Sequence, residues 1–195
     1  MRALRAIRLV AAGLSLLAMA SCQDSSGPRS AYEPLSEDRR DPAAAQKLAL
    51  EAADLLASDP AKAESLLREA LADDLYCGSA HNNLGVIYLK QSKLYEAANE
   101  FEWSRKLMPG HPDPRVNLAL TLEHAGKTDD ALATYRTALE IYPDYLPALE
   151  GLASLQLRTA KPDASTHHAL EEISLRASTS TWGAWAREQL TRQRP

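Results

Sequence analysis

The feature that most constrains this chain is an internal repeat with a period of 34 residues, which begins near residue 44 and continues through most of the sequence. Three series of residues keep this interval: Leu50, Leu84, Leu118 and Leu152; Ala63, Ala97, Ala131 and Ser165; Leu67, Phe101, Tyr135 and Ala169. A fixed period of this length predicts a solenoid, in which each unit packs mainly against its neighbours because none can bury its apolar face alone.

Each unit is predicted to be a pair of short helices. One phenylalanine, eight glycines and abundant Ala and Leu favour helices over strands. The segments "KQSK", "HAGKTDD" and "TAKPD" predict the turns within successive units. Asp59 followed by Pro60 predicts the start of a second helix, because Asp caps helix N-termini and Pro suits the first helical position. Small residues are expected where helices cross closely, at Gly85, Ala97, Ala119 and Ala131.

The pattern within the units resembles the tetratricopeptide repeat (TPR) family across roughly residues 44–177. The second unit carries Leu84-Gly85, Tyr88, Ala97, Phe101 and Pro109, and the third keeps Gly126, Ala131, Tyr135, Ala138 and Pro143. The resemblance implies an all-α superhelical solenoid with units of about 44–77, 78–111, 112–145 and 146–177. The last unit matches more loosely, with Ser165 and Glu172 where alanines are expected, as is common for terminal repeats.

Residues 178–195 predict a capping helix and tail. In "WGAWAREQLTRQ", Trp182, Trp185 and Leu190 share one face at helical spacing. We expect this face to cover the exposed side of the last repeat; the alternative is an aromatic docking patch for a partner.

The N-terminus predicts a secretory signal over residues 1–21. Arg2, Arg5 and Arg8 precede the 12-residue apolar stretch "LVAAGLSLLAMA". The following "LAMASC" resembles the lipobox of bacterial lipoproteins, with Met19 where Leu is usual, which implies lipidation of Cys22. The alternative is ordinary secretory cleavage beside an incidental cysteine. Removal of residues 1–21 takes away three arginines and no acidic residue, which leaves 19 basic and 26 acidic residues and a net charge of −7.

Residues 22–43 are predicted to be a flexible tether, since they are rich in Ser, Pro and charge. Such a tether spans roughly 25 Å root-mean-square. The acidic balance argues against a nucleic-acid partner, because phosphate binding depends on basic residues. With Cys22 lipidated, Cys77 has no partner for an intramolecular disulfide and is expected to be a small apolar filler.

No catalytic motif is present in the sequence, so we expect no enzymatic activity, no cofactor and no metal. His167-His168, with Glu171 or Glu172 one turn on, could suggest a metal site. Adjacent helical residues point about 100° apart, however, so two such histidines seldom reach one ion. A solvated helix face is the favoured interpretation.

The resemblance implies that the inner groove of the solenoid binds an extended peptide or a partner helix. The residues expected on this surface are Asn82, Asn83, Val86, Lys90, Val116, Asn117, Leu120, His124, Glu150, Ser154 and Arg158. Asn82 and Val86 replace the Lys and Asn by which one TPR type grips a C-terminal carboxylate, which argues against that mode. In another type, one asparagine per unit pairs with a peptide backbone. Asn83 and Asn117 match this ladder, whereas Ala49 and Gly151 break it.

The recurrence of asparagine has two explanations. It is common at that position in TPR units, so a structural role is favoured, while a binding role needs free amides on the inner face. On the second helix of the second unit, Tyr95 and Trp103 are expected to form an exposed aromatic pair; packing against the next unit is an equal alternative.

We expect a membrane-anchored adaptor or scaffold for protein partners in a bacterial cell envelope. Gln23 after the acylated cysteine, in place of an Asp retention signal, favours the outer membrane, facing the periplasm, in a cell with two membranes. One alternative is an assembly or pilot lipoprotein for a pilus or secretion machine. Another is an enzyme whose site lies in the poorly matching ends.

Overall fold

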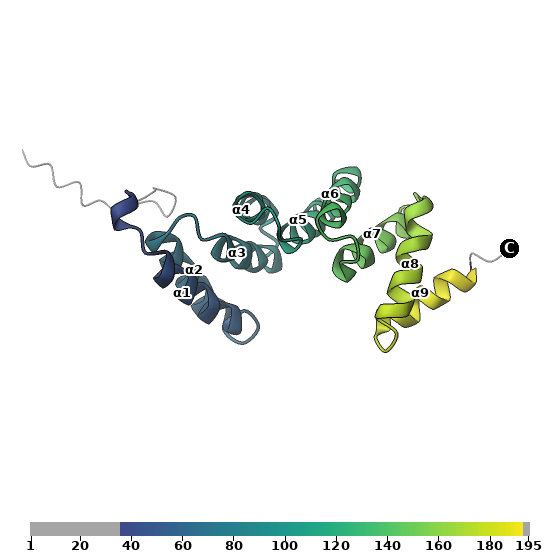
Figure 1. Ribbon diagram of the computed structural model, residues 1–195, viewed down its shortest axis with the longest axis horizontal. Coiled ribbons are helices and arrows are strands. Elements are labelled where there is room, and N and C mark those ends of the chain that lie inside the picture. The colour runs from purple at the N-terminus through teal and green to yellow at the C-terminus, as the bar shows by residue number, and fades with distance from the viewer. Residues whose placement is uncertain (1–35, 193–195) are drawn as a thin grey trace, which may run out of the picture.

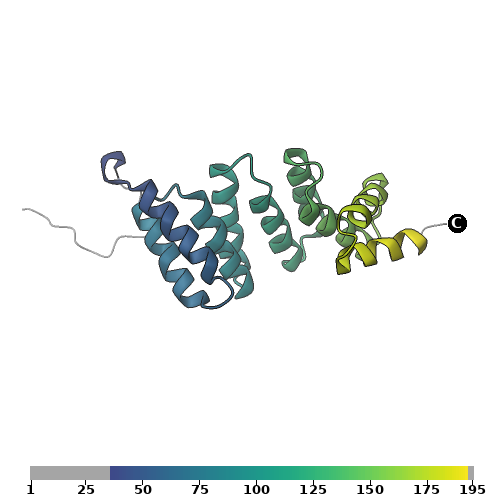
Figure 2. The ribbon, with the colours of Figure 1, turned by 60° about the horizontal axis from the view of Figure 1, so that its bottom comes forward.

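A computed structural model describes residues 36–192, which form nine α-helices and no strand. Figures 1 and 2 show the helices in a row, from α1 at one end to α9 at the other. After a short 3₁₀ helix (Glu37–Arg39), the elements are α1 (Pro42–Leu55), α2 (Pro60–Asp73), α3 (Gly78–Lys90), α4 (Leu94–Leu107), α5 (Asp113–His124), α6 (Thr128–Ile141), α7 (Leu146–Arg158), α8 (Ala164–Arg176) and α9 (Thr181–Arg192). The predicted all-α solenoid of helix pairs is confirmed.

Aspartate side chains cap the N-termini of three helices, α1, α2 and α8. The Asp59 carboxylate accepts a hydrogen bond from the Lys62 amide at 3.0 Å, with Pro60 at the first helical position, as the sequence predicts. Asp41 and Pro42 repeat this arrangement at the start of α1, two residues before the expected beginning of the first unit. The caps therefore mark the helix starts more accurately than the repeat period does.

The turn inside each of the later units has one geometry. Ser92, Gly126 and Ala160, spaced 34 residues apart, all adopt left-handed backbone conformations with φ of 59°, 73° and 53°. In each turn the following lysine amide donates to the carbonyl five residues back, at 2.8–2.9 Å; these lysines are Lys93, Lys127 and Lys161. These contacts are the Schellman motif, which closes the first helix of the unit before the second begins.

The core is built from the residues that carry the period. Ala63, Ala97 and Ala131 are fully buried, and Leu84 and Leu152 are 1% exposed. Leu50 belongs to the same leucine series but is 61% exposed. The later leucines pack against a preceding unit, and α1 is the first helix of the stack, so the side chain has no preceding unit to contact among residues 36–192.

The residues just before α1 are bonded to the end of α2 and to the connection between α2 and α3. Arg40 donates to the Asp74 carboxylate at 2.8 and 3.2 Å and lies over the Tyr76 ring, 4.6 Å from its centroid. The Asp41 amide adds a hydrogen bond to the Asp73 carbonyl. Arg40 and Asp41, near the end of the predicted tether, are thus bonded to the solenoid. Cys22 and the signal segment lie outside the described residues, and no helix within 36–192 is long and apolar enough to cross a bilayer.

At the other end, α9 packs against α8. Ala186 is fully buried, and Trp185 and Leu190 contact the apolar cluster of the last unit, as expected of a capping helix. Trp182 is 37% exposed and meets Trp185 edge-on, with ring centroids 5.1 Å apart. Two of the three predicted residues therefore cover the last repeat, and the third lies at its margin.

The left-handed turns give a testable prediction. Ser92→Gly and Ala160→Gly should each raise the free energy of unfolding by up to ~1 kcal/mol, because a Cβ is strained at positive φ. Gly126→Ala should lower it by about the same amount, although a Cβ there would have no atom within 4 Å. Urea denaturation measures these differences. Gly110→Ala is the control, since this glycine has open space and no positive φ; equal effects at Gly110 and Gly126 would contradict the strain argument.

Candidate peptide-binding groove

The predicted groove residues lie on the first helices of successive units. Contacts join α1 to α3, α3 to α5 and α5 to α7, while the second helix of each unit packs against the first helix of the next. The first helices therefore form a continuous inner row. The expected residues come from α3, α5 and α7 of this row. The groove is thus made by three neighbouring helices rather than by one cavity.

The three asparagines form a chain of hydrogen bonds along this row. The Asn117 amide on α5 donates to the Asn82 side-chain oxygen at 3.0 Å, and Asn82 donates to the Asn83 side-chain oxygen at 3.4 Å. Asn83 then donates to the Ala49 carbonyl of α1 at 3.4 Å. The amides thus link three inner helices, which supports a structural share in their recurrence. All three are half-buried, so one side of each stays open to solvent.

Charged groove residues also link neighbouring units. Lys90 donates to the Leu56 carbonyl at 3.2 Å, and Arg158 pairs with Glu123 at 2.6 Å. The partners in these bonds lie 34 and 35 residues apart, so each bond joins near-equivalent positions of neighbouring units. Both basic side chains lie in the last turn of their helices, where the negative end of the helix dipole stabilises a positive charge. His124, at the equivalent position of α5, is exposed.

The apolar and small residues of the groove are only partly covered. Val86 packs at the margin of the apolar cluster of the first two units, and Val116 at the margin of the cluster that α5, α6 and α7 share. Leu120 and Ser154 are half-buried. Burial raises the pKa of Glu150 above its ordinary value. The inner row therefore presents amides beside apolar patches, with few unpaired charges.

Glu123 and Tyr135 adjoin the groove, and the sequence pattern assigned neither residue to it. The Tyr135 ring from α6 reaches α7 at Gly151, where an added Cβ would lie 2.4 Å from the ring. Its pKa is raised, first by burial and then by the nearby Glu123 carboxylate, which also pairs with Arg158. This packing explains why glycine replaces asparagine at 151: any side chain there would collide with the ring. The break in the asparagine ladder was the available signal.

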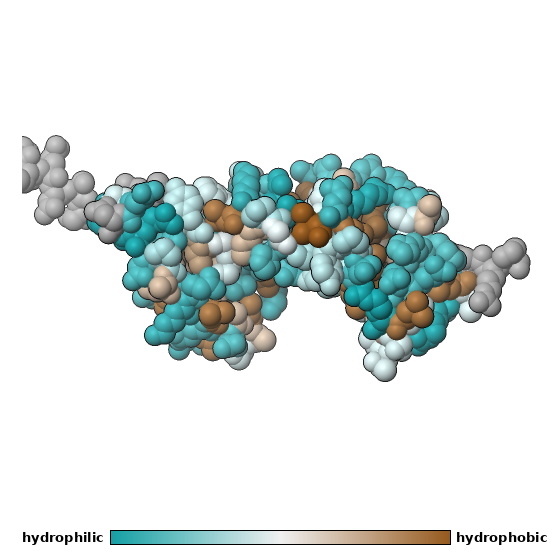
Figure 3. Space-filling view, viewed as in Figure 1, coloured by the Kyte–Doolittle hydropathy of each residue, from teal (hydrophilic) through white to brown (hydrophobic). Residues whose placement is uncertain are grey.

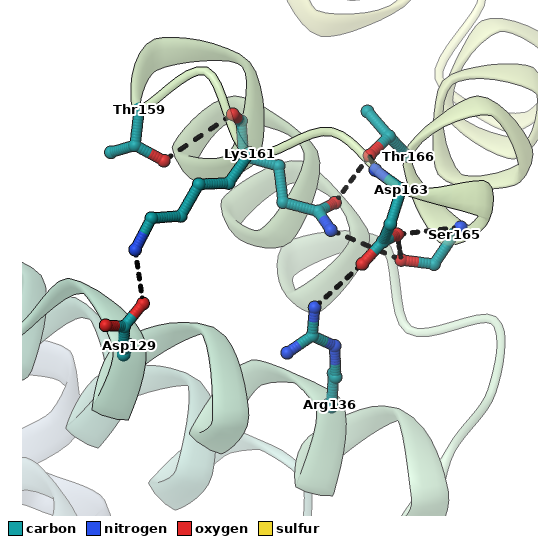
Figure 4. A network of polar contacts seen from close by, with 8 residues as sticks. Asp129, Arg136, Thr159, Lys161, Asp163, Ser165 and Thr166 are labelled. Atoms are coloured by element: carbon teal, nitrogen blue, oxygen red, sulfur yellow. Dashed lines mark hydrogen bonds and ion pairs between the residues drawn. The ribbon is translucent and has the colours of Figure 1, made fainter.

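On the outer side, polar contacts join the last two units (Figure 4). Lys161 pairs with Asp129 at 2.5 Å, and Arg136 on α6 pairs with Asp163 at 2.9 Å. Hydrogen bonding by Ser165, and then by Gln156 and Arg136, lowers the pKa of Asp163 to about 2 against the opposing effect of burial. These contacts hold the beginning of α8 against α6 and were not visible in the periodic pattern.

The predicted aromatic pair on α4 does not form one patch. Trp103, 38% exposed, lines a pocket of about 610 Å³ with Tyr88, and its ring stacks on His81 with centroids 5.5 Å apart. Tyr95, 78% exposed, instead lines a smaller pocket against α5. Eight residues correspond to about 80° of rotation beyond two full turns, which separates the two rings. Figure 3 likewise shows apolar residues in small separate patches on a mainly hydrophilic face.

The histidine pair lies on the exposed face of α8. His167 meets Glu171 at 3.3 Å, and His168 is exposed. Within residues 36–192 no three His, Cys, Asp or Glu side chains are grouped closely enough to hold a metal ion.

Comparisons with known proteins give the family of the repeats. Tetratricopeptide repeat profiles match residues 53–102 and 112–155. The chain carries tetratricopeptide repeats. Curated protein sequences gave no match.

Solved structures are similar in fold at low sequence identity. The first TPR domain of Spaghetti (RPAP3), bound to an HSP90 peptide, is 16% identical over 63% of this chain and 98% of that one, with a TM-score of 0.58. MamA is 19% identical over 71% of this chain and 83% of that one, with a TM-score of 0.62. The O-GlcNAc transferase of Thermobaculum terrenum is 22% identical over 71% of this chain but only 27% of that enzyme, with a TM-score of 0.62. At these identities the likeness concerns the fold.

The hydrogen bonds of the asparagines predict that their removal destabilises the fold. Asn83→Ala with Asn117→Ala should lower the free energy of unfolding by ~1–2 kcal/mol, since each loses a hydrogen bond usually worth about 0.5–1.5 kcal/mol. Urea denaturation tests this. Asn99→Ala, the same change at an exposed position on α4, should have a smaller effect. If the double variant is as stable as the wild type, the amides do not hold the inner helices together.

Proposed function

We propose that the chain is a lipid-anchored scaffold in a bacterial cell envelope, which binds an extended segment of a protein partner in its inner groove and catalyses no reaction itself. The observation that carries this proposal is the row of half-buried amides and apolar side chains along three successive inner helices. A groove of this kind is made by the stacking of units, which is how repeat proteins form extended binding surfaces.

The chemistry of the groove favours a main chain over a charged ligand. A side-chain amide offers both donors and an acceptor, so it can pair with the N–H and C=O of an extended peptide whatever its sequence. Val86 and Leu120 add apolar contacts between the amides. The basic residues Lys90 and Arg158 are already bound to a carbonyl and a carboxylate of this chain, which disfavours an anionic partner such as nucleic acid.

The anchor is proposed from the N-terminal sequence. "LAMASC" ends the apolar stretch at Cys22, and residues 23–35 separate this cysteine from the described part of the chain. Acyl chains contribute about 0.8 kcal/mol per buried methylene, so two or more chains would hold the protein stably on a membrane. Gln23 favours the outer membrane in a cell that has two.

The anchor is tested by metabolic labelling with an alkyne fatty acid. Wild-type protein should take up the label and enter the detergent phase, whereas Cys22→Ala should do neither. Cys77→Ala is the matched control, because this buried cysteine should not be acylated. Equal labelling of the wild type and Cys22→Ala would refute the lipoprotein assignment.

Partner binding is tested by crosslinking in envelope fractions. Leu120→Gln with His124→Gln alters the groove surface of α5 and should reduce capture of the main partner about tenfold, which corresponds to ~1.4 kcal/mol. Ala133→Gln with Thr137→Gln makes a similar change on the exposed side of α6 and should have no effect. If both variants capture the partner as the wild type does, the groove is not the binding surface. A pilus or secretion subunit as the partner would identify the narrower role of an assembly factor.

A further inference from the structure

A histidine and a glutamate are buried together between α3 and α4. His81 is 0% exposed and Glu100 is 2% exposed. Nδ1 of His81 lies 2.6 Å from a carboxylate oxygen of Glu100, and Nε2 lies 2.8 Å from the Leu75 carbonyl oxygen. The imidazole also stacks on Trp103, with an interplanar angle of 10°. Two ionisable groups thus meet at the connection between the first and second units.

The two contacts constrain the protons that this pair holds. A carbonyl oxygen can only accept, so Nε2 must carry a hydrogen to bond Leu75. Nδ1 and the carboxylate oxygen, 2.6 Å apart, would repel unless a proton lay between them. The folded pair therefore holds two protons, either as imidazolium and carboxylate or as imidazole and carboxylic acid. Burial raises the pKa of Glu100 to about 7 and lowers the pKa of His81, which favours the uncharged arrangement.

The repeat itself does not require this pair. The positions 34 residues away from His81 and Glu100 are occupied in the other units by Lys47 with Leu66, Arg115 with Thr134, and Leu149 with His168. None of these combinations places an imidazole beside a carboxylate, so none can share a proton in this way. The pair is therefore a feature of the second unit and not of the solenoid.

The contacts of the pair reach both sides of the unit junction. Leu75 belongs to the connection between α2 and α3, whose neighbour Asp74 binds Arg40. On the outer side, Glu100 and Trp103 line the pocket of about 610 Å³. The pair thus joins the connection, both helices of the second unit and a surface open to solvent.

We propose that His81 and Glu100 form a proton-operated latch on the junction between the first and second units. With its shared proton the pair holds the α2–α3 connection and the Trp103 ring in place. Without it, a buried carboxylate faces an imidazole lone pair, and the connection and Trp103 loosen to let water reach the carboxylate through the pocket.

The other ionisable groups on the surrounding elements have contacts of their own. On the connection, Asp74 binds Arg40, which also lies over the Tyr76 ring, and Cys77 contacts Gln46 and Ser79. On α2, Arg68 binds Glu64 and the Tyr88 hydroxyl of α3. On α4, Glu102 binds Arg105, while Glu96 and Lys106 line the pocket. The exposed members of this set are screened by solvent, so the buried pair dominates the response to pH.

The sign of the pH dependence follows from counting protons. Unfolded Glu and His have pKa values of about 4.3 and 6.5, so between these values both the folded and unfolded chains hold two protons on the pair. Above pH ~6.5 the unfolded chain loses one. The stabilisation is therefore full below that pH and is lost as the pH rises through the folded value of about 7. Because these two pKa values differ by about half a unit, the folding constant falls by about threefold in total.

The first experiment compares urea unfolding at pH 6.0 and 8.5. Glu100→Gln keeps a donor for Nδ1 without an ionisable group, so its folding constant should fall about 2.5-fold less than that of the wild type over this interval. Glu96→Gln, an exposed change in the same pocket, should behave as the wild type. Parallel profiles for the wild type and Glu100→Gln would overturn the proposal.

The second experiment follows the wild type directly and remains available if Glu100→Gln does not fold. The chain has three tryptophans, so incorporation of 5-fluorotryptophan gives three ¹⁹F resonances, and Trp103→Phe assigns one of them. The Trp103 resonance should titrate near neutral pH, while those of Trp182 and Trp185 should not. A Trp103 resonance that is constant from pH 5.5 to 9 would exclude the latch.

Discussion

The structure depends on the burial of each unit's apolar face by the neighbouring unit. Ala63, Ala97 and Ala131 allow the helices to approach closely enough for this contact, and the leucine series fills the space between them. Leu50 shows the same constraint from the other side: with the same residue at the same position, but no preceding unit within residues 36–192, the side chain is 61% exposed. The groove exists only because the units stack, so stability and binding surface share one origin.

The periodic part of this fold could be predicted from the sequence, because a 34-residue interval of small and large apolar residues permits few other arrangements. The turns were predictable in place but not in geometry. Only Gly126 suggests a left-handed residue, whereas Ser92 and Ala160 take that conformation because the Schellman hydrogen bonds and the packing of both helices impose it. Local preference was overruled there by tertiary contacts.

The site was less predictable, because its residues act through partners that differ between units. Asn83 and Asn117 are equivalent in the sequence, yet one binds a main-chain carbonyl and the other a neighbouring side chain. Gly151 interrupts the series for a reason that lies on another helix, the Tyr135 ring. Tyr95 and Trp103 were expected together and lie at different pockets, since spacing alone does not fix which neighbour each ring meets. Periodicity thus locates the inner helices, and departures from it reveal their particular contacts.

The linear arrangement of contacts also determines how far a local change can travel. The latch on the α2–α3 connection includes His81 of α3, the same helix that Asn83 joins to α1 through the Ala49 carbonyl. Loosening of this junction would therefore reshape the N-terminal end of the groove first. The later units are held together independently, by Lys161 with Asp129 and by Arg136 with Asp163 on the outer side. Because each unit contacts mainly its neighbours, loss of the shared proton should open one end of the groove while the other keeps its shape. A partner that spans the whole groove would thus respond to pH, and one confined to the last two units would not.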